Sequence, residues 1–475
     1  MARTRSRLAR SVAAVALLAV LVGCERWENE LASVNETGTA SASGPSFFPE
    51  LTDDGSKVVF TSCAGDFGAT DTNGDEDVYV RDLTSGVTSL VSVNAAGTGA
   101  GDDRSYFPTL SPDASKVAFL SSARDLTSPG VEEPGSHLYV RDLASGTTTL
   151  VSTGESRSAG YWRPDGTRIA WIVWPSGDVP PKIVERDLTT GEVRELAPGH
   201  AVHYGPTGNS IAYVNDGAVW LKNLQTGSVR LLSGGLPGTT TDGAPVFSHD
   251  GSRIAFLRQP SSSLWGRQDV YVWDRATATT QLVTVSLPGI PPGGMTRGRV
   301  VAFHPTDANR LLFTHEVANL VPGDAHQRED VFVRDLAQGV TTAVSLNAAG
   351  SGTANLRSTD PMWLGNGDKV AFVTLAFDLG ITDTNLATDI YVRTLSSGSY
   401  TLVSINAARD NTGNGDSGAF RIPGLGSTLY FGDVSASADG RRIVYGSYAS
   451  NLAGADGNGY EGHDIFVADL VETDP

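Results

Sequence analysis

Four segments of the chain carry carboxylate and amide side chains at spacings that could hold a metal ion. In three of them an Asp is followed six residues later by an Asp that opens an apolar stretch, and the fourth segment is looser. Oxygen ligands alternating around a bend are what a hard cation such as Ca²⁺ requires. The candidate metal ligands are Asp71, Asn73, Asp75, Asp77, Asp324, Asp330, Asp383, Asn385, Asp389, Asp456, Asn458 and Asp464.

The same residues also suit a metal-free role. Asp and Asn cap turns by hydrogen-bonding to nearby backbone amides. The segment that begins at Asp71 resembles the start of an EF-hand loop, but it lacks the distal bidentate Glu in register. His326 and His463 lie in two of the four acidic segments and could add an imidazole ligand. Calcium is therefore the one cofactor that the sequence admits, and metal-free turns remain the alternative.

The sequence contains no set of residues arranged for covalent catalysis. The run Gly415-Asp416-Ser417-Gly418 is similar to the nucleophile segment of trypsin-like proteases, but no Ala-Ala-His-Cys segment accompanies it. The sequence also has no Gly-x-Ser-x-Gly elbow of the α/β-hydrolase type. Aromatic side chains in the predicted loops could instead stack on a sugar or grip a peptide. The ligand-binding candidates are Phe67, Trp265 and Tyr460.

The elements that position these residues follow from an internal repeat. Residues 48–60 (FPELTDDGSKVVF) recur as residues 107–119 (FPTLSPDASKVAF), and weaker copies follow along the chain. Each copy has a turn signal between two apolar stretches, which predicts a strand–turn–strand unit. A second predicted hairpin, beginning for example at Asp77, follows each copy. The aromatic residues that end the eight copies are Phe60, Phe119, Trp171, Tyr213, Phe256, Phe313, Phe372 and Tyr445.

Four strands repeated eight times predict an all-β fold, an eight-bladed β-propeller. The last repeat lacks a fourth strand, and the stretch around Leu31 and Ser33 mimics the fourth strand of the first repeat around Leu90 and Ser92. We therefore expect residues 27–36 to complete the last blade and close the ring, and their deletion to lower cooperative stability sharply. The predicted blades span about 45–95, 104–155, 158–197, 200–233, 242–286, 298–347, 358–406, and 429–472 together with 27–36.

The first 23 residues predict an export signal. Four Arg precede an apolar run from Val12 to Val22, which is too short to span a bilayer. The run ends in Leu21-Val22-Gly23-Cys24, which resembles the lipobox of bacterial lipoproteins. This resemblance implies cleavage before Cys24, lipidation of that residue, and a location on the extracytoplasmic side of a membrane, in the periplasm or at the cell surface. A plain secretory signal is the alternative. Residues 24–475 are then a single propeller domain.

The strand-pair motif carries a family resemblance. Residues 111–119 (SPDASKVAF) resemble the WD40-like repeats, also called PD40 repeats, of TolB-type propellers, and the resemblance extends over nearly all of residues 45–472. It implies the propeller fold. It does not imply one activity, because such propellers serve as scaffolds, receptors and domains of peptidases.

Charge and loop placement indicate the class of function. Removal of residues 1–23 leaves 31 basic and 53 acidic residues, a net charge of −22, which disfavours nucleic acid and anionic lipid as partners. We expect a monomer that contacts the membrane through its lipid alone. The long acidic loops gather on one face and predict a binding or scaffold protein for a protein, peptide or cell-wall glycan ligand. The alternative is a metal-assisted polysaccharide lyase or hydrolase with its site at the central channel.

Overall fold

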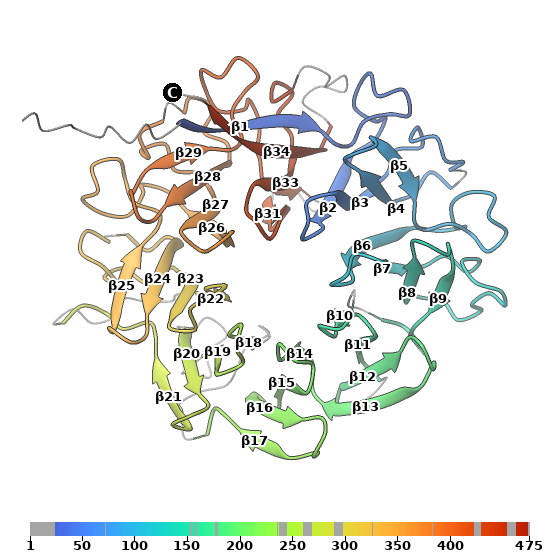
Figure 1. The fold of residues 1–475 in the computed structure, drawn as a ribbon, viewed down its shortest axis with the longest axis horizontal. Coiled ribbons are helices and arrows are strands. Elements are labelled where there is room, and N and C mark those ends of the chain that lie inside the picture. Colours follow the sequence, from blue (N-terminus) through green and yellow to red (C-terminus); the bar gives the residue numbers. More distant parts are fainter. Residues whose placement is uncertain are drawn as a thin grey trace, which may run out of the picture.

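The computed structural model describes residues 24–71, 73–152, 154–156, 158, 160–175, 179–234, 236, 245–259, 268–288, 298–324, 326–381, 383–421, 429–453 and 462–473. These residues form strands and irregular connections without a helix. Eight four-stranded antiparallel sheets stand in a ring, each with its first strand nearest the centre (Figure 1). The eight-bladed propeller predicted from the repeat is confirmed.

The first four blades follow one another in chain order. Their strands are β2 (Ser46–Leu51), β3 (Lys57–Ser62), β4 (Asp77–Asp82), β5 (Val87–Leu90); β6 (Ser105–Leu110), β7 (Lys116–Ser121), β8 (His137–Asp142), β9 (Thr148–Leu150); β10 (Tyr161–Trp162), β11 (Arg168–Val173), β12 (Lys182–Asp187), β13 (Val193–Pro198); β14 (Ala201–Tyr204), β15 (Ser210–Asn215), β16 (Ala218–Asn223) and β17 (Val229–Leu231).

The next three blades repeat this order, and blade eight departs from it. Their strands are β18 (Val246–Phe247), β19 (Arg253–Arg258), β20 (Asp269–Asp274), β21 (Thr279–Leu282); β22 (Gly298–Phe303), β23 (Arg310–His315), β24 (Asp330–Asp335), β25 (Val340–Ala343); β26 (Ser358–Leu364), β27 (Lys369–Thr374), β28 (Asp389–Thr394), β29 (Tyr400–Leu402); and, in blade eight, β32 (Val434–Ala436), β33 (Arg442–Ser447), β34 (Asp464–Thr473) and β1 (Cys24–Leu31). A separate two-stranded ribbon, β30 (Ala419–Arg421) with β31 (Leu429–Phe431), precedes blade eight, so the first strand of that blade begins later than predicted.

Aromatic side chains form the repeating core of the ring. The aromatic residue that ends each sequence repeat lies on the second strand of its blade and is buried. In six blades it stacks on an aromatic residue of the third strand, as in the Phe60–Tyr79 pair, whose ring centroids are 6.0 Å apart. Offset stacking of this kind adds to the free energy that burial of the rings supplies. The periodic aromatic residues therefore join the second and third strands within each of these six blades.

The N-terminal strand closes the ring as predicted. Strand β1 pairs with β34 over eight positions, from Cys24 opposite Thr473 to Leu31 opposite Phe466 (Figure 1). The expected strand at residues 27–36 is shifted, because the ladder ends at Leu31 and the chain then turns. The turn is set by the backbone amide of Ser33, which donates to the Ile465 carbonyl, while the Ser33 hydroxyl donates to the Asp464 carboxylate at 2.7 Å.

Trp27 anchors the closing strand to blade seven as well as to blade eight. Its side chain is 2 % exposed, and it packs in one cluster with core residues of both blades. Its indole N–H donates to the Thr401 hydroxyl at 3.2 Å. Within the described part of the chain, no helical segment has the length and apolar character needed to cross a bilayer.

We expect Trp27→Ala to lower the free energy of unfolding by about 3–5 kcal/mol, since it leaves a cavity between two blades. Chemical denaturation of the purified protein measures this loss. Arg26→Ala, on the exposed side of the same strand, is the control and should change stability by less than about 0.5 kcal/mol. Equal effects of the two substitutions would contradict the closing role of the Trp27 side chain.

Candidate functional site

A hydrogen-bonded latch ties the start of the third strand to the end of the fourth on one face of the ring. In blade one the Ser92 hydroxyl donates to the Asp77 carboxylate at 2.6 Å and accepts from the Val78 amide at 3.1 Å. Blades five, six, seven and eight repeat the arrangement with Thr284–Asp269, Ser345–Asp330, Ser404–Asp389 and Ser33–Asp464. The long connections of the ring begin and end at this face, which we call the loop face.

Three of the latch carboxylates keep one oxygen without a hydrogen bond. Asp77, Asp330 and Asp389 are buried, and the Oδ2 atom of each accepts no hydrogen bond. Burial raises the pKa of Asp77 to about 7 and that of Asp330 to about 8, and it raises the pKa of Asp389 well above its ordinary value. A buried acceptor without a partner is costly, so these positions would gain from a proton or a cation.

In blades one and seven, the middle residue of the acidic segment serves a turn. The Asn73 side-chain amide donates to the Gly101 carbonyl at 2.8 Å, and its Oδ1 accepts from the Asp75 backbone amide at 2.7 Å. Asn385 makes the equivalent contacts with Gly413 and Ala387. Both Asn oxygens are thus engaged in local turns, which is the metal-free role that the sequence left open. Calcium at these segments stays a prediction.

Blade six differs because a histidine occupies the middle position. Asp324, His326 and Asp330 form the one group of three metal-ligating side chains among the described residues, with ligand atoms all within 4.8 Å of one another. Asp324 and Asp330 are buried, and His326 is partly exposed. The Leu320 amide donates to Asp324 Oδ2 at 3.1 Å, which fixes that carboxylate in place. The structure therefore brings together three of the residues that the sequence singled out.

Other predicted site residues are placed differently. The Phe67 ring is 4 % exposed and packs on Phe60 and Tyr79, with centroids 5.7 and 4.6 Å away, so it belongs to the core of blade one. Phe67 is also one of the residues that line the hollow of blade one described below, so its role in ligand binding stays a prediction. The Asp464 carboxylate accepts the hydrogen bond from the Ser33 hydroxyl in the latch of blade eight. The predicted residues Asp456, Asn458, Trp265 and Tyr460 lie outside the described residues.

Polar groups near the central axis occur in pairs. Asp433 Oδ2 lies 3.4 Å from His463 Nε2, and the Arg299 guanidinium lies 3.2 Å from the Asp360 carboxylate. Ser417, in the protease-like run, is buried, and its hydroxyl hydrogen-bonds to another Ser at 2.9 Å. A substrate therefore has no access to that hydroxyl. Asp433 stands outside every repeated motif, so no sequence pattern indicated it.

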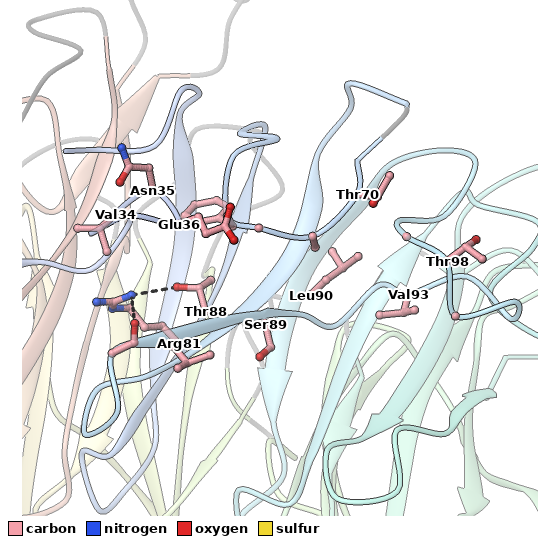
Figure 2. Close-up of a pocket in the computed structure, with 17 residues that line it drawn as sticks. Val34, Asn35, Glu36, Thr70, Arg81, Thr88, Ser89, Leu90, Val93 and Thr98 are labelled. Carbon is pink, nitrogen blue, oxygen red and sulfur yellow. Dashed lines mark hydrogen bonds between the residues drawn. The ribbon is translucent and has the colours of Figure 1, made fainter. Parts of the chain in front are cut away.

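A hollow of about 600 Å³ runs along the outer strand of blade one, from the connections of the loop face to the turn between β4 and β5 (Figure 2). Asn35 and Glu36 stand on one side, Thr98 stands on the other, and the outermost strand β5 runs between them. Arg81 donates from Nη1 to the Gly86 carbonyl at 2.8 Å and to the Thr88 hydroxyl at 3.1 Å. The lining thus offers hydroxyl, amide and carboxylate groups beside the free edge of a strand.

Comparisons with known proteins support no statement beyond the fold. No protein-family model matches the chain. Dipeptidyl-peptidase 5 of Porphyromonas gingivalis is 28 % identical over 148 residues, which are 31 % of this chain and 20 % of that protein. The chain thus spans about a fifth of the length of this curated relative. No activity follows from so short a match.

Solved structures of propeller proteins show the same coarse likeness. An oligogalacturonate lyase in complex with manganese is 14 % identical, with a TM-score of 0.46 and coverage of 95 % of this chain and 98 % of that one. TolB from Acinetobacter baumannii is 17 % identical, with a TM-score of 0.32 and coverage of 71 % and 77 %. The eight sheets themselves establish the fold, and these likenesses add nothing about activity.

Glu50 gives blade one a measurable pH dependence at the end of β2 that leads into the tight β2–β3 turn. It lies on the innermost strand of blade one, and its carboxylate accepts from the Leu110 amide of blade two at 3.1 Å. Burial raises its pKa to about 7 from an ordinary value of 4.5. The folded state therefore holds the proton more firmly than the unfolded state, and the stabilisation present below about pH 4.5 is lost as the pH rises through about 7.

We expect Glu50→Gln to remove this part of the pH dependence, because Gln keeps an acceptor for Leu110 without a charge. The variant should match the wild type at pH 5 and exceed its free energy of unfolding at pH 8 by about 1–3 kcal/mol. Denaturant titrations at the two pH values measure the difference. Glu132→Gln, at an exposed position, is the control and should leave the pH dependence unchanged. The same pH dependence in Glu50→Gln as in the wild type would contradict the assignment.

Proposed function

We propose that the protein is an exported, lipid-anchored binding or scaffold module that recognises a protein, peptide or cell-wall glycan through the loop face. The observation that carries the proposal is the hollow of blade one, which opens among the connections of that face. Irregular connections held by a rigid scaffold are the usual place for recognition. The acidic surface disfavours polyanionic partners.

The chemistry of the hollow suits an extended polar chain. β5 is the outermost strand of its sheet, so its outer backbone edge has no neighbouring strand in that sheet. A peptide can add to such an edge by backbone hydrogen bonds. The hydroxyls of Thr70 and Thr98 and the amide of Asn35 offer the donors and acceptors that sugar hydroxyls require. Peptide and glycan are thus both compatible with the lining.

The direction of β1 supports a definite orientation at a membrane. Cys24 pairs with the last residue of β34, at the end of the blade opposite the loop face. A lipid on Cys24 would then hold the tight-turn face near the membrane and direct the loop face outward. Export and lipidation rest on the lipobox-like segment of the sequence.

The enzyme alternative has less support than binding. It requires a metal at the central channel, whereas the three-ligand group of blade six lies on a connection between second and third strands. Two of its three ligands are buried, so the group offers little access to a polysaccharide. Binding is the function that the geometry favours.

The experiment is a binding screen of the soluble protein without residues 1–23 against peptidoglycan fragments and a peptide library, followed by affinity measurements on two variants. Thr88→Trp should fill the hollow from β5 and weaken binding at least tenfold. Thr341→Trp, at the equivalent position of β25, is the matched control and should bind like the wild type, since it breaks the same Arg–Thr contact in another blade. Equal binding by both variants would exclude the hollow, and turnover of any fragment would favour the enzyme alternative.

A further inference from the structure

Two buried acceptor atoms face each other in blade six. His326 Nδ1 lies 3.7 Å from Asp330 Oδ2, and neither atom has a hydrogen-bond partner. The other imidazole nitrogen, Nε2, lies 2.7 Å from the Ala354 carbonyl oxygen. A carbonyl oxygen only accepts, so Nε2 carries the hydrogen, and in the neutral ring Nδ1 presents a lone pair. Two lone pairs at this distance repel each other unless a positive charge lies between them.

Asp324 completes the surroundings of that gap. One of its carboxylate oxygens lies within 4.8 Å of the ligand atoms of both other residues. Ligand atoms about 2.1 Å from a shared ion and 3.7 Å apart subtend an angle of about 120° at that ion, which a coordination sphere with N and O ligands accommodates. The Nε2–H bond to a backbone carbonyl is also the outer contact that orients metal-ligating histidines.

We propose that Asp324, His326 and Asp330 bind a divalent transition-metal ion of the zinc or manganese type. One imidazole nitrogen with two carboxylates favours such ions over Ca²⁺, which prefers ligand sets made of oxygen alone. Bound there, the ion ties the connection between β23 and β24 to the first residue of β24, and the His326 Nε2–H bond holds the segment around Ala354 that follows β25. This site is independent of the ligand proposed for the hollow of blade one.

The other blades supply an internal comparison. Asn73 and Asn385 take the place of His326, and their side-chain amides make the same contact with the equivalent carbonyl groups of Gly101 and Gly413. Their Oδ1 atoms accept backbone hydrogen bonds, whereas His326 Nδ1 has no partner. The substitution of His for Asn at this position thus leaves one nitrogen free to bind a metal, where the Asn oxygen is used in a turn.

The competing explanation is a proton in place of the ion. A protonated His326 would form an ion pair with Asp330 at the same 3.7 Å separation. Metal titrations separate the two explanations, because a proton-linked pair gains nothing from Zn²⁺ or Mn²⁺, whereas a metal site binds one ion with a defined affinity.

The test is isothermal titration of the EDTA-stripped protein with Zn²⁺, Mn²⁺ and Ca²⁺, combined with thermal melting in each ion. The wild type should bind Zn²⁺ or Mn²⁺ at this site with a rise in melting temperature, and His326→Asn should weaken that binding at least tenfold and abolish the rise. His249→Asn, at an exposed turn, is the matched control and should behave like the wild type. A millimolar Ca²⁺ background should leave Zn²⁺ binding unchanged.

Co²⁺ gives a second readout that does not depend on stability. Its visible absorption should shift on binding to the wild type and not to His326→Asn, with Asp324→Asn as a further variant should the first be unfolded in EDTA. Wild-type protein that binds no transition metal, or variants that bind it with wild-type affinity, would overturn the proposal. Displacement of Zn²⁺ by Ca²⁺ at equal concentration would also overturn it.

Discussion

Antiparallel pairing between β1 and β34 makes the eight sheets one closed ring. The pairing joins residues at opposite ends of the described chain, and Trp27 extends it by packing against blade seven. Ser33, just beyond the strand, supplies the hydroxyl that latches Asp464. Without this strand, β34 would lose its backbone hydrogen-bond partner and become the outermost strand of blade eight. The loop face of blade one begins where this closing segment turns, so the hollow there also depends on the closure.

The latch at the start of the third strand in five of the eight blades explains why buried carboxylates recur on one face. An Asp that accepts from a Ser or Thr hydroxyl holds the third strand against the end of the fourth, and the same hydroxyl accepts a backbone amide. The carboxylate is thereby removed from water, and in Asp77, Asp330 and Asp389 one oxygen remains without a hydrogen bond. The carboxylates that hold the strands together are thus the same ones that keep an oxygen free to bind a ligand. A repeated structural contact leaves a repeated acceptor, and in blade six His326 places an imidazole nitrogen opposite it, as the proposed metal site requires.

The hollow and the three-ligand group belong to different blades of the ring. The hollow lies at the outer strand of blade one, whereas the three-ligand group lies between connections of blade six. Both are built from segments that join strands, while the sheets carry the stacked aromatic core. This division is typical of a scaffold in which the framework is fixed and the connections differ.

The sequence by itself determined the repeat, the eight blades and the closing strand. Turn signals and apolar alternation act between neighbouring residues, and the copy of the Leu90–Ser92 pattern at Leu31–Ser33 indicated its place in the last blade. The tertiary structure alone decided which members of the acidic segments form a site. Phe67 is buried because Phe60 and Tyr79 surround it, and His326 Nδ1 is available because the Ala354 carbonyl, 28 residues later, engages Nε2. Such contacts depend on the packing of distant segments and on the exclusion of water, which residue spacing does not encode.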